Sequence, residues 1–216
     1  MKNIEAIIFD LDGVIVDTAK YHFLAWQRLA RELDIEFTIE DNERLKGVSR
    51  MRSLEIILEI GNKTLDEKEK EDLAFKKNEW YKEYIANMDE SEILEGAKEF
   101  IELLRENNIK VVLGSASKNA KTILEKLNLI DCFHAIIDGT CVTKAKPDPQ
   151  VFLQGAEAVG IDPINCIVFE DAEAGIEAAK RAGMVAIGVG EADTLKDAHI
   201  QIKGLYEMNM ERLMSL

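Results

Sequence analysis

The sequence predicts an α/β protein: a parallel sheet core with helices on both faces and a helical cap inserted after the first strand. Two observations carry this prediction. Short apolar runs alternate with helical patterns through most of the chain, as expected for buried parallel strands joined by crossover helices. The stretch that follows the first apolar run reads instead as helix after helix with charged outer faces.

The alternating elements can be placed by residue range. Asp148 and Pro149 form a suitable N-cap and first-turn pair for one helix. Gly160 and Gly183 stand where helices are expected to end. Strands are predicted over residues 4–9, 110–113, 135–137, 166–169 and 185–189, and helices over 98–106, 120–127, 149–159 and 173–182.

The inserted helices define the expected domains, a Rossmann-like core of residues 1–16 and 88–216 and a cap of residues 17–87. In the cap, Ser49 and Asp66 are suited to cap helices that run toward Ile60 and Tyr84. An earlier helix is indicated by an apolar stripe of Phe23, Trp26, Ala30 and Leu33. A cap in this place in the chain is expected over the carboxyl end of the first strand, where open parallel sheets bind ligands.

Length and composition exclude several classes of protein. The chain has 216 residues, 47% of them hydrophobic and only 3 prolines, which excludes collagen-like and disordered proteins. Its net charge of -14 repels nucleic acid and anionic lipid. No apolar run approaches the roughly 20 residues of a membrane helix, and the N-terminal segment lacks the pattern of a signal peptide. We expect a cytoplasmic protein without nucleic-acid or membrane partners.

The cysteines do not indicate a disulfide framework or a zinc site. Cys132, Cys141 and Cys166 are odd in number and lack a CxxC spacing. We expect three buried, reduced thiols.

Two acids follow the first strand, at Asp10 and Asp12, with Gly13 directly after them. A turn at this point brings both carboxylates to one crevice, where one can attack while the other moves a proton. An acidic surface loop is the alternative interpretation of this segment alone.

The second strand runs into small hydroxyl residues, Ser115 and Ser117, before a helix. A helix start offers N–H groups to a phosphate, and the Ser115 hydroxyl is a further donor. Alternatively, Ser117 merely caps the helix.

Two further segments carry charge to strand or helix ends. Pro147 disfavours helix at Lys146, so this lysine can reach inward, although Lys144 and Lys146 can also be solvated loop residues. Glu170 and Asp171 end a strand, where they can cap the following helix or bind a hard cation such as Mg²⁺.

Taken in this order, the FDLDGV start, the strand-terminal serine, the Lys-Pro pair and the acidic strand end resemble the haloacid dehalogenase superfamily of phosphotransferases. The resemblance covers essentially the whole chain. It implies that Asp10 is the nucleophile and Asp12 the general acid/base. It also implies a Mg²⁺ site formed by Asp10, the Asp12 backbone carbonyl, Glu170 and Asp171, and a phosphoryl site formed by Ser115, the Ala116 N–H and Lys146.

The cap segments bear on the substrate. Thr18, His22 and Trp26 share a helix face, although Trp26 can equally be core packing. The segment from Leu45 to Arg50 offers a glycine turn, a capped helix start and a guanidinium, which suit a second phosphate. The alternative interpretation is that Arg50 is simply an exposed surface arginine.

These cap segments, with KKN at residues 76–78 and GSASKN at residues 114–119, narrow the resemblance to the beta-phosphoglucomutase family. That family interconverts beta-glucose 1-phosphate and glucose 6-phosphate through a bisphosphate intermediate, which needs two phosphate pockets. Ala172 departs from the polar residue expected there. The resemblance implies substrate contacts from Thr18, His22, Trp26, Gly47, Val48, Ser49, Arg50, Lys77, Ser117, Lys118 and Asn119.

Two other functions remain open from the sequence. A Mg²⁺-dependent sugar-phosphate phosphatase would use the same scaffold, and a non-catalytic sugar-phosphate sensor would need no Asp10 and Asp12 pair. We expect a monomer that acts on a small-molecule sugar phosphate.

Overall fold

The computed structural model describes residues 3–45, 48–190 and 195–216. The chain divides into two compact units, Met1–Asp17 with Asp89–Leu216, and Thr18–Met88. We call them the core unit and the helical unit. The domain limits of residues 1–16 with 88–216 and of residues 17–87 remain a prediction.

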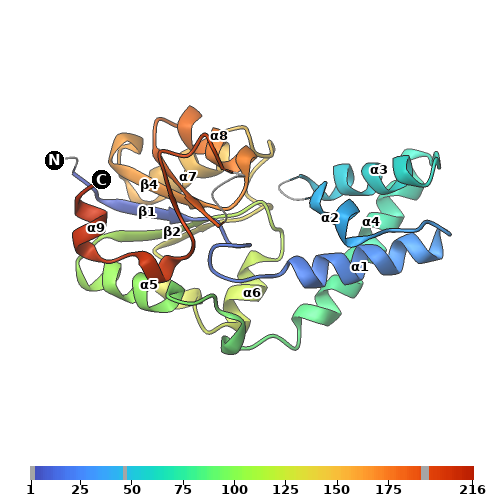
Figure 1. Ribbon diagram of the computed structural model, residues 1–216, viewed down its shortest axis with the longest axis horizontal. Helices are drawn as coiled ribbons and strands as arrows, with labels where there is room; N and C mark the ends of the chain where they lie inside the picture. Colours follow the sequence, from blue (N-terminus) through green and yellow to red (C-terminus); the bar gives the residue numbers. More distant parts are fainter. Residues whose placement is uncertain (1–2, 46–47, 191–194) are drawn as a thin grey trace. The chain divides into compact units, whose positions relative to one another are not determined.

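The core unit is built on a parallel sheet, which confirms the predicted α/β fold (Figure 1). The strand order is β3-β2-β1-β4-β5-β6. The sixth strand was not predicted. The strands are β1 (Ala6–Phe9), β2 (Lys110–Gly114), β3 (Ala135–Ile137), β4 (Cys166–Glu170), β5 (Val185–Val189) and β6 (Ile200–Ile202).

The first strand lies between β2 and β4, and its apolar sequence explains this central place. All four residues of β1 are fully buried, as expected for a strand covered on both faces. Phe9 is in register with Leu113 of β2 and with Phe169 of β4. The residues that follow these strands therefore emerge at one edge of the sheet, where the strand order reverses direction around β1.

Helices cover both faces of this sheet. Helix α5 (Ala97–Glu106) contacts β2 on one face, and α7 (Gln150–Val159) and α8 (Glu173–Arg181) lie on the other (Figure 1). Phe100 of α5 packs edge-on against Phe9 and Phe169. The remaining elements are α6 (Ala120–Lys126), α9 (Met210–Met214) and the 3-10 turns η1 (Glu90–Glu92), η2 (Ile130–Cys132), η3 (Pro163–Asn165) and η4 (Leu205–Glu207).

Some helix ends differ from the sequence prediction by a residue or more. Helix α7 begins one residue later than expected, with Pro149 at the N-cap, although the Asp148 carboxylate still accepts a hydrogen bond from the Gln150 N–H at 3.0 Å. Ser117 is not the N-cap of α6; that position belongs to Asn119. Gly160 does end α7, with φ of 70°.

The helical unit contains α1 (Ala19–Glu32), α2 (Ile39–Glu43), α3 (Arg50–Ile60) and α4 (Glu67–Ile85). Ser49 and Asp66 cap α3 and α4, as the sequence indicates. Of the predicted apolar stripe on α1, Trp26 and Ala30 are buried, and Phe23 and Leu33 are half-buried. Helix α4 packs against both α1 and α3, and all three helices contribute buried apolar residues to the core of this unit.

Two expectations about the surface can be compared with the structure. Cys166 is buried, Cys132 is half-buried and Cys141 is exposed, so the prediction of three buried thiols is wrong. Cys141 lies in the turn that follows the edge strand β3, where its Sγ is 3.5 Å from Oδ1 of Asp138. Among the described residues, no helix combines the length and the apolar character that crossing a membrane requires.

Candidate active site

The carboxyl ends of β1 and β4 bring two acids together. Asp10 directly follows β1, and Glu170 is the last residue of β4. The Asp10 N–H donates to the Phe169 carbonyl at 2.9 Å, which continues the pairing of the two strands to the point where both side chains emerge. The side chains of Asp10 and Glu170 are 9% and 2% exposed.

Lys146 bridges these two carboxylates. Its Nζ lies 2.5 Å from Oδ1 of Asp10 and 2.8 Å from Oε2 of Glu170. The lysine side chain is 5% exposed, so the ammonium is removed from water, and burial alone would lower its pKa. The two neighbouring carboxylates outweigh this effect and raise the pKa of Lys146 above its ordinary value. Lys146 is therefore a buried, permanently charged group and not the solvated loop residue that was the alternative.

Two glycines allow the acids to approach the backbone closely. A Cβ on Gly13 would lie 2.1 Å from Oδ2 of Asp171, and Gly13 also has φ of 75°. A Cβ on Gly175 would lie 2.0 Å from Cδ of Glu170. Any side chain at these positions would displace a carboxylate. Gly175 was missed in the sequence because it reads as an ordinary residue of an alanine-rich helix.

Asp10, Glu170 and Asp171 form an acidic cluster. Each offers an oxygen within 4.8 Å of the others. Burial and the neighbouring carboxylates raise the pKa of Asp171 to about 9. Burial raises the pKa of Glu170 to about 7, against the opposing effect of Lys146. The cluster thus holds more negative charge than Lys146 balances, and it is stabilised by protons or by a cation.

The donor set fits a magnesium ion. Mg²⁺ prefers carboxylate oxygens, and it is commonly bound through one or two carboxylates together with substrate phosphate. Burial and crowding of the carboxylates raise the pKa values of Glu170 and Asp171. The same crowding favours the binding of a cation that neutralises their charge. Neither acid is the N-cap of α8, which is Ala172, although Oε1 of Glu170 accepts a hydrogen bond from the Ala172 N–H at 3.3 Å.

Asp12 lies in the tight turn that follows β1. The Gly13 N–H donates to the Val16 carbonyl at 2.8 Å, and Asp12 and Val16 form an isolated β-bridge. Asp12 is half-buried. The turn keeps Asp12 beside Asp10 at the same end of the sheet.

The loop after β2 carries Ser115, Ala116 and Ser117. Ser115 is 1% exposed, and its N–H donates to the Ile137 carbonyl of β3 at 2.9 Å. Its Oγ accepts a hydrogen bond from the Ser117 N–H at 3.1 Å. Ser117 Oγ in turn accepts from the Asn119 N–H at 3.2 Å. The hydroxyls thus order the loop itself before α6 begins.

In the helical unit, Lys77 is the centre of a buried polar cluster. Its Nζ lies 2.9 Å from Nδ1 of His22 and over the rings of Trp26 and Tyr81, at 4.4 and 5.0 Å from their centroids. Lys77 is 2% exposed and Trp26 is likewise 2% exposed. Burial, Lys77 and Arg50 lower the pKa of His22 well below its ordinary value. Trp26 is therefore a core residue of this unit as well as a neighbour of His22.

The other predicted residues of the helical unit differ in exposure. Thr18 is buried, Arg50 is half-buried at the start of α3, and Val48 and Ser49 are exposed. The Ser49 hydroxyl accepts from the Arg52 N–H at 3.2 Å. Gly47 lies outside the described residues. Lys118 and Asn119, in the core unit, are exposed and buried respectively.

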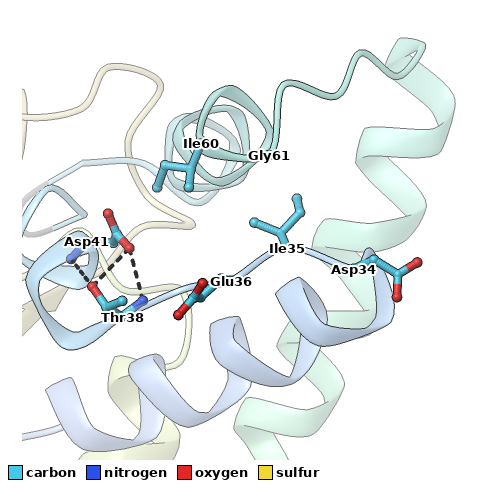
Figure 2. A pocket seen from close by; sticks show the side chains of 7 residues that line it. All are labelled: Asp34, Ile35, Glu36, Thr38, Asp41, Ile60 and Gly61. Atoms are coloured by element: carbon cyan, nitrogen blue, oxygen red, sulfur yellow. Dashed lines mark hydrogen bonds between the residues drawn. The ribbon is translucent and has the colours of Figure 1, made fainter.

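A hollow on the helical unit contains none of the predicted site residues (Figure 2). It is bordered by the acids Asp34, Glu36 and Asp41 and by Ile60 and Gly61. The Asp41 carboxylate accepts from the Thr38 N–H and hydroxyl, both at 3.0 Å. These bonds cap the start of α2, so they are explained by the helix and do not indicate a ligand.

Comparisons with known proteins agree with this geometry. A family model described as haloacid dehalogenase-like hydrolase matches residues 4–183. A beta-phosphoglucomutase of Bacillus subtilis is 44% identical over 97% of this chain and 93% of its own length. The crystal structure of a beta-phosphoglucomutase from Clostridium difficile is 42% identical, with a TM-score of 0.94 over 98% of this chain and 96% of that one. A fructose-1-phosphate phosphatase of Escherichia coli is 33% identical over 85% of this chain and 95% of its own length.

Proposed function

This chain belongs to the haloacid dehalogenase-like hydrolase family, and from that premise we propose that it is an enzyme that interconverts beta-glucose 1-phosphate and glucose 6-phosphate. The reaction passes through an aspartyl-phosphate enzyme and a bisphosphate intermediate. The observation that carries the proposal is the cluster of Asp10, Lys146, Glu170 and Asp171 in a chain so similar to two beta-phosphoglucomutases along nearly its whole length.

Asp10 is the nucleophile in this proposal. A carboxylate oxygen of Asp10 forms a bond to phosphorus as the bond from phosphorus to the donor oxygen breaks, and Asp12 gives the leaving oxygen a proton. In the return step Asp12 takes the proton of the acceptor hydroxyl, whose oxygen attacks phosphorus while the Asp10 carboxylate leaves. One carboxylate thus carries the phosphoryl group, and the other carries the proton.

The remaining core residues hold the phosphoryl group and balance charge. Phosphoryl transfer depends mainly on positioning and electrostatic stabilisation. Lys146 is a fixed positive charge beside Asp10, and we assign the Ser115 hydroxyl and the Ala116 N–H as neutral donors. Asp10, the Asp12 backbone carbonyl, Glu170 and Asp171 would hold Mg²⁺, which would neutralise charge on the phosphoryl oxygens.

A mutase needs a second contact for the distal phosphate. We assign it to Arg50, whose planar guanidinium suits bidentate binding of phosphate. We propose that His22 and Lys77 couple closure of the cap to the reaction at the nucleophile Asp10. The further substrate contacts are proposed to come from Thr18, Trp26, Gly47, Val48, Ser49, Ser117, Lys118 and Asn119.

A product assay tests the proposed function. The protein is incubated with beta-glucose 1-phosphate, Mg²⁺ and a trace of beta-glucose 1,6-bisphosphate. Glucose 6-phosphate is the expected product. Free phosphate with little glucose 6-phosphate would favour the sugar-phosphate phosphatase, an activity that the Escherichia coli relative's name describes. Absence of both products would favour a sensor.

The same assay with other hexose phosphates defines the preferred sugar. The monomeric state is likewise a proposal, which size-exclusion chromatography with light scattering tests.

A further inference from the structure

The turn after β3 touches the loop that carries Ser115. Gly139 lies in this turn, and its N–H donates to the Ser117 carbonyl at 3.1 Å. A Cβ built on Gly139 would lie 2.2 Å from the Ala116 carbonyl oxygen and 3.0 Å from the Ala116 carbonyl carbon. These are backbone atoms, so a side chain at residue 139 would force the Ala116 carbonyl to move.

The peptide that Gly139 touches also holds Ser115. The Ala116 carbonyl and the Ser117 N–H belong to one planar peptide unit. Its oxygen faces Gly139, and its N–H donates to Ser115 Oγ at 3.1 Å. Because Oγ accepts this bond, the Ser115 hydroxyl proton is directed toward another acceptor. The orientation of this one peptide therefore decides where the Ser115 hydroxyl donates.

Conformational freedom does not explain the glycine. The φ of Gly139 lies outside the left-handed region, so alanine could adopt the same backbone conformation. The close approach to Ala116 is the feature that requires the absence of a side chain.

The turn itself is fixed by Asp138, a carboxylate that is 2% exposed. Its Oδ1 accepts from the Thr140 N–H at 2.8 Å and from the Thr140 hydroxyl at 2.5 Å. The Cys141 N–H donates to the Asp138 carbonyl at 2.9 Å. These bonds hold Gly139 against the loop after β2.

We propose that Gly139 is a positioning residue for phosphoryl transfer, which acts through the Ala116–Ser117 peptide on the Ser115 hydroxyl. This inference rests on the proposed role of Ser115 as a phosphoryl donor contact. A methyl group at residue 139 pushes the Ala116 carbonyl, turns the peptide and breaks the bond from the Ser117 N–H to Ser115 Oγ.

A double-mutant cycle tests the proposal. The rate of aspartyl-phosphate formation from acetyl phosphate is measured for wild type, Gly139→Ala, Ser115→Ala and the double variant. Loss of one preorganised donor lowers such rates by about 10²-fold, so Gly139→Ala should slow the wild type by about tenfold or more. In the Ser115→Ala background the same change should cost less than about twofold, because the hydroxyl it positions is gone. Equal losses in both backgrounds would overturn the proposal.

Gly160→Ala is the matched control. Gly160 also takes a methyl group only at a cost, since its φ is 70°, but nothing lies within 4 Å of the added Cβ. It should lower the melting temperature and leave the transfer rate unchanged. A rate loss in Gly160→Ala as large as in Gly139→Ala would show a general effect of stability and would also overturn the proposal.

Asp138 provides a second route if Gly139→Ala does not fold. Asp138→Asn keeps an oxygen for Thr140, and Asp138→Ala removes it. The alanine variant should slow transfer only where Ser115 is present, and the asparagine variant should restore most of the rate. A loss that is independent of Ser115 would contradict the proposal. A wild type that transfers no phosphoryl group from acetyl phosphate or beta-glucose 1-phosphate would remove the proposed function as well, whereas a transferring wild type with an additive cycle removes only this inference.

Discussion

The Lys77 ammonium lies 2.9 Å from Nδ1 of His22. An ammonium can only donate, so Nδ1 must be the acceptor and the imidazole is neutral with its proton on Nε2. Stacking of the His22 ring on Tyr81, with centroids 4.1 Å apart, fixes the plane in which that proton points. The helical unit thus presents a histidine in one tautomer.

The first prediction concerns the charge of His22. Lys77→Met keeps the packing of the side chain but removes its charge, so the pKa of His22 should rise toward its ordinary value while burial keeps it below that value. NMR titration of the imidazole measures this. Lys76→Met is the control, because Lys76 is exposed and pairs with Glu32. A wild-type His22 that titrates near pH 6.5 would contradict the lowering of its pKa by burial and by Lys77.

The second prediction concerns the nucleophile. Asp10→Asn should abolish turnover and leave the fold intact, because an amide cannot form the acyl phosphate. Trapping of phosphoprotein from labelled acetyl phosphate, with circular dichroism as the check on folding, measures both. Steady transfer by a folded Asp10→Asn protein would remove Asp10 from this role.

The third prediction separates the two acids of the first turn. Asp12→Asn should slow the mutase reaction by about 10²–10⁴-fold, since the sugar oxygen loses its proton donor and acceptor. The proposed metal contact of Asp12 uses its backbone carbonyl, so Mg²⁺ affinity measured by calorimetry should be retained. If that affinity collapses together with the rate, the Asp12 side chain is a ligand and its acid/base role is wrong.

The fourth prediction concerns the distal phosphate. Arg50→Ala should cost roughly 2–4 kcal/mol in mutase kcat/KM, as expected for loss of a charge-assisted contact. Hydrolysis of acetyl phosphate, which has no distal phosphate, should change little. Arg52→Ala is the control, since Arg52 lies in the same helix and pairs with Glu55 and Glu59 on an exposed face. Equal losses of both activities in Arg50→Ala would favour the phosphatase.

The fifth prediction concerns pH and metal. The pKa values of Glu170 and Asp171 are raised to about 7 and about 9, so the metal-free folded protein holds protons that the unfolded chain releases near about pH 4. The stability that these protons contribute is complete below that pH and is lost as the pH rises through about 7 and about 9.

Added Mg²⁺ should therefore raise the melting temperature more at roughly pH 8.5 than at roughly pH 6, because it replaces protons that are missing at high pH. Scanning calorimetry with EDTA and with Mg²⁺ measures the two increments. Asp171→Asn, which has no carboxyl to titrate, should reduce the difference between them. A metal-free protein that gains stability across this pH range would contradict the assigned burial of the acids.

Much of the fold follows from local sequence. The apolar run of β1 and the capping residues Ser49 and Asp66 are readable because the signal lies within a few residues. Strand β6 was missed because its three residues, Ile-Gln-Ile, carry too little pattern to separate from a loop. The start of α7 was misplaced by one residue, because the Asp148 carboxylate accepts a hydrogen bond from the Gln150 N–H although the helix begins only at Gln150.

Some residues of the site can likewise be recognised in the sequence, and others cannot. Asp10, Lys146, Glu170 and Asp171 are chemically conspicuous at strand and helix ends, and the structure brings them together. Their catalytic roles stay predictions. Gly139 and Gly175 carry no functional group. A Cβ on Gly139 would meet the carbonyl of Ala116, more than twenty residues away, and a Cβ on Gly175 would meet the carboxylate of Glu170. Only the packed structure shows that a methyl group has no room there.

The contact between Asp10 and Lys146 spans 136 residues of chain, which has a consequence for synthesis on the ribosome. Asp10 is translated 136 residues before Lys146, and β4 follows Lys146 in the chain. A nascent chain therefore carries Asp10 without the ammonium that neutralises it or the strand that buries it. Assembly of the acidic cluster is a late event in folding, and a truncated product that ends before β4 cannot form the cluster.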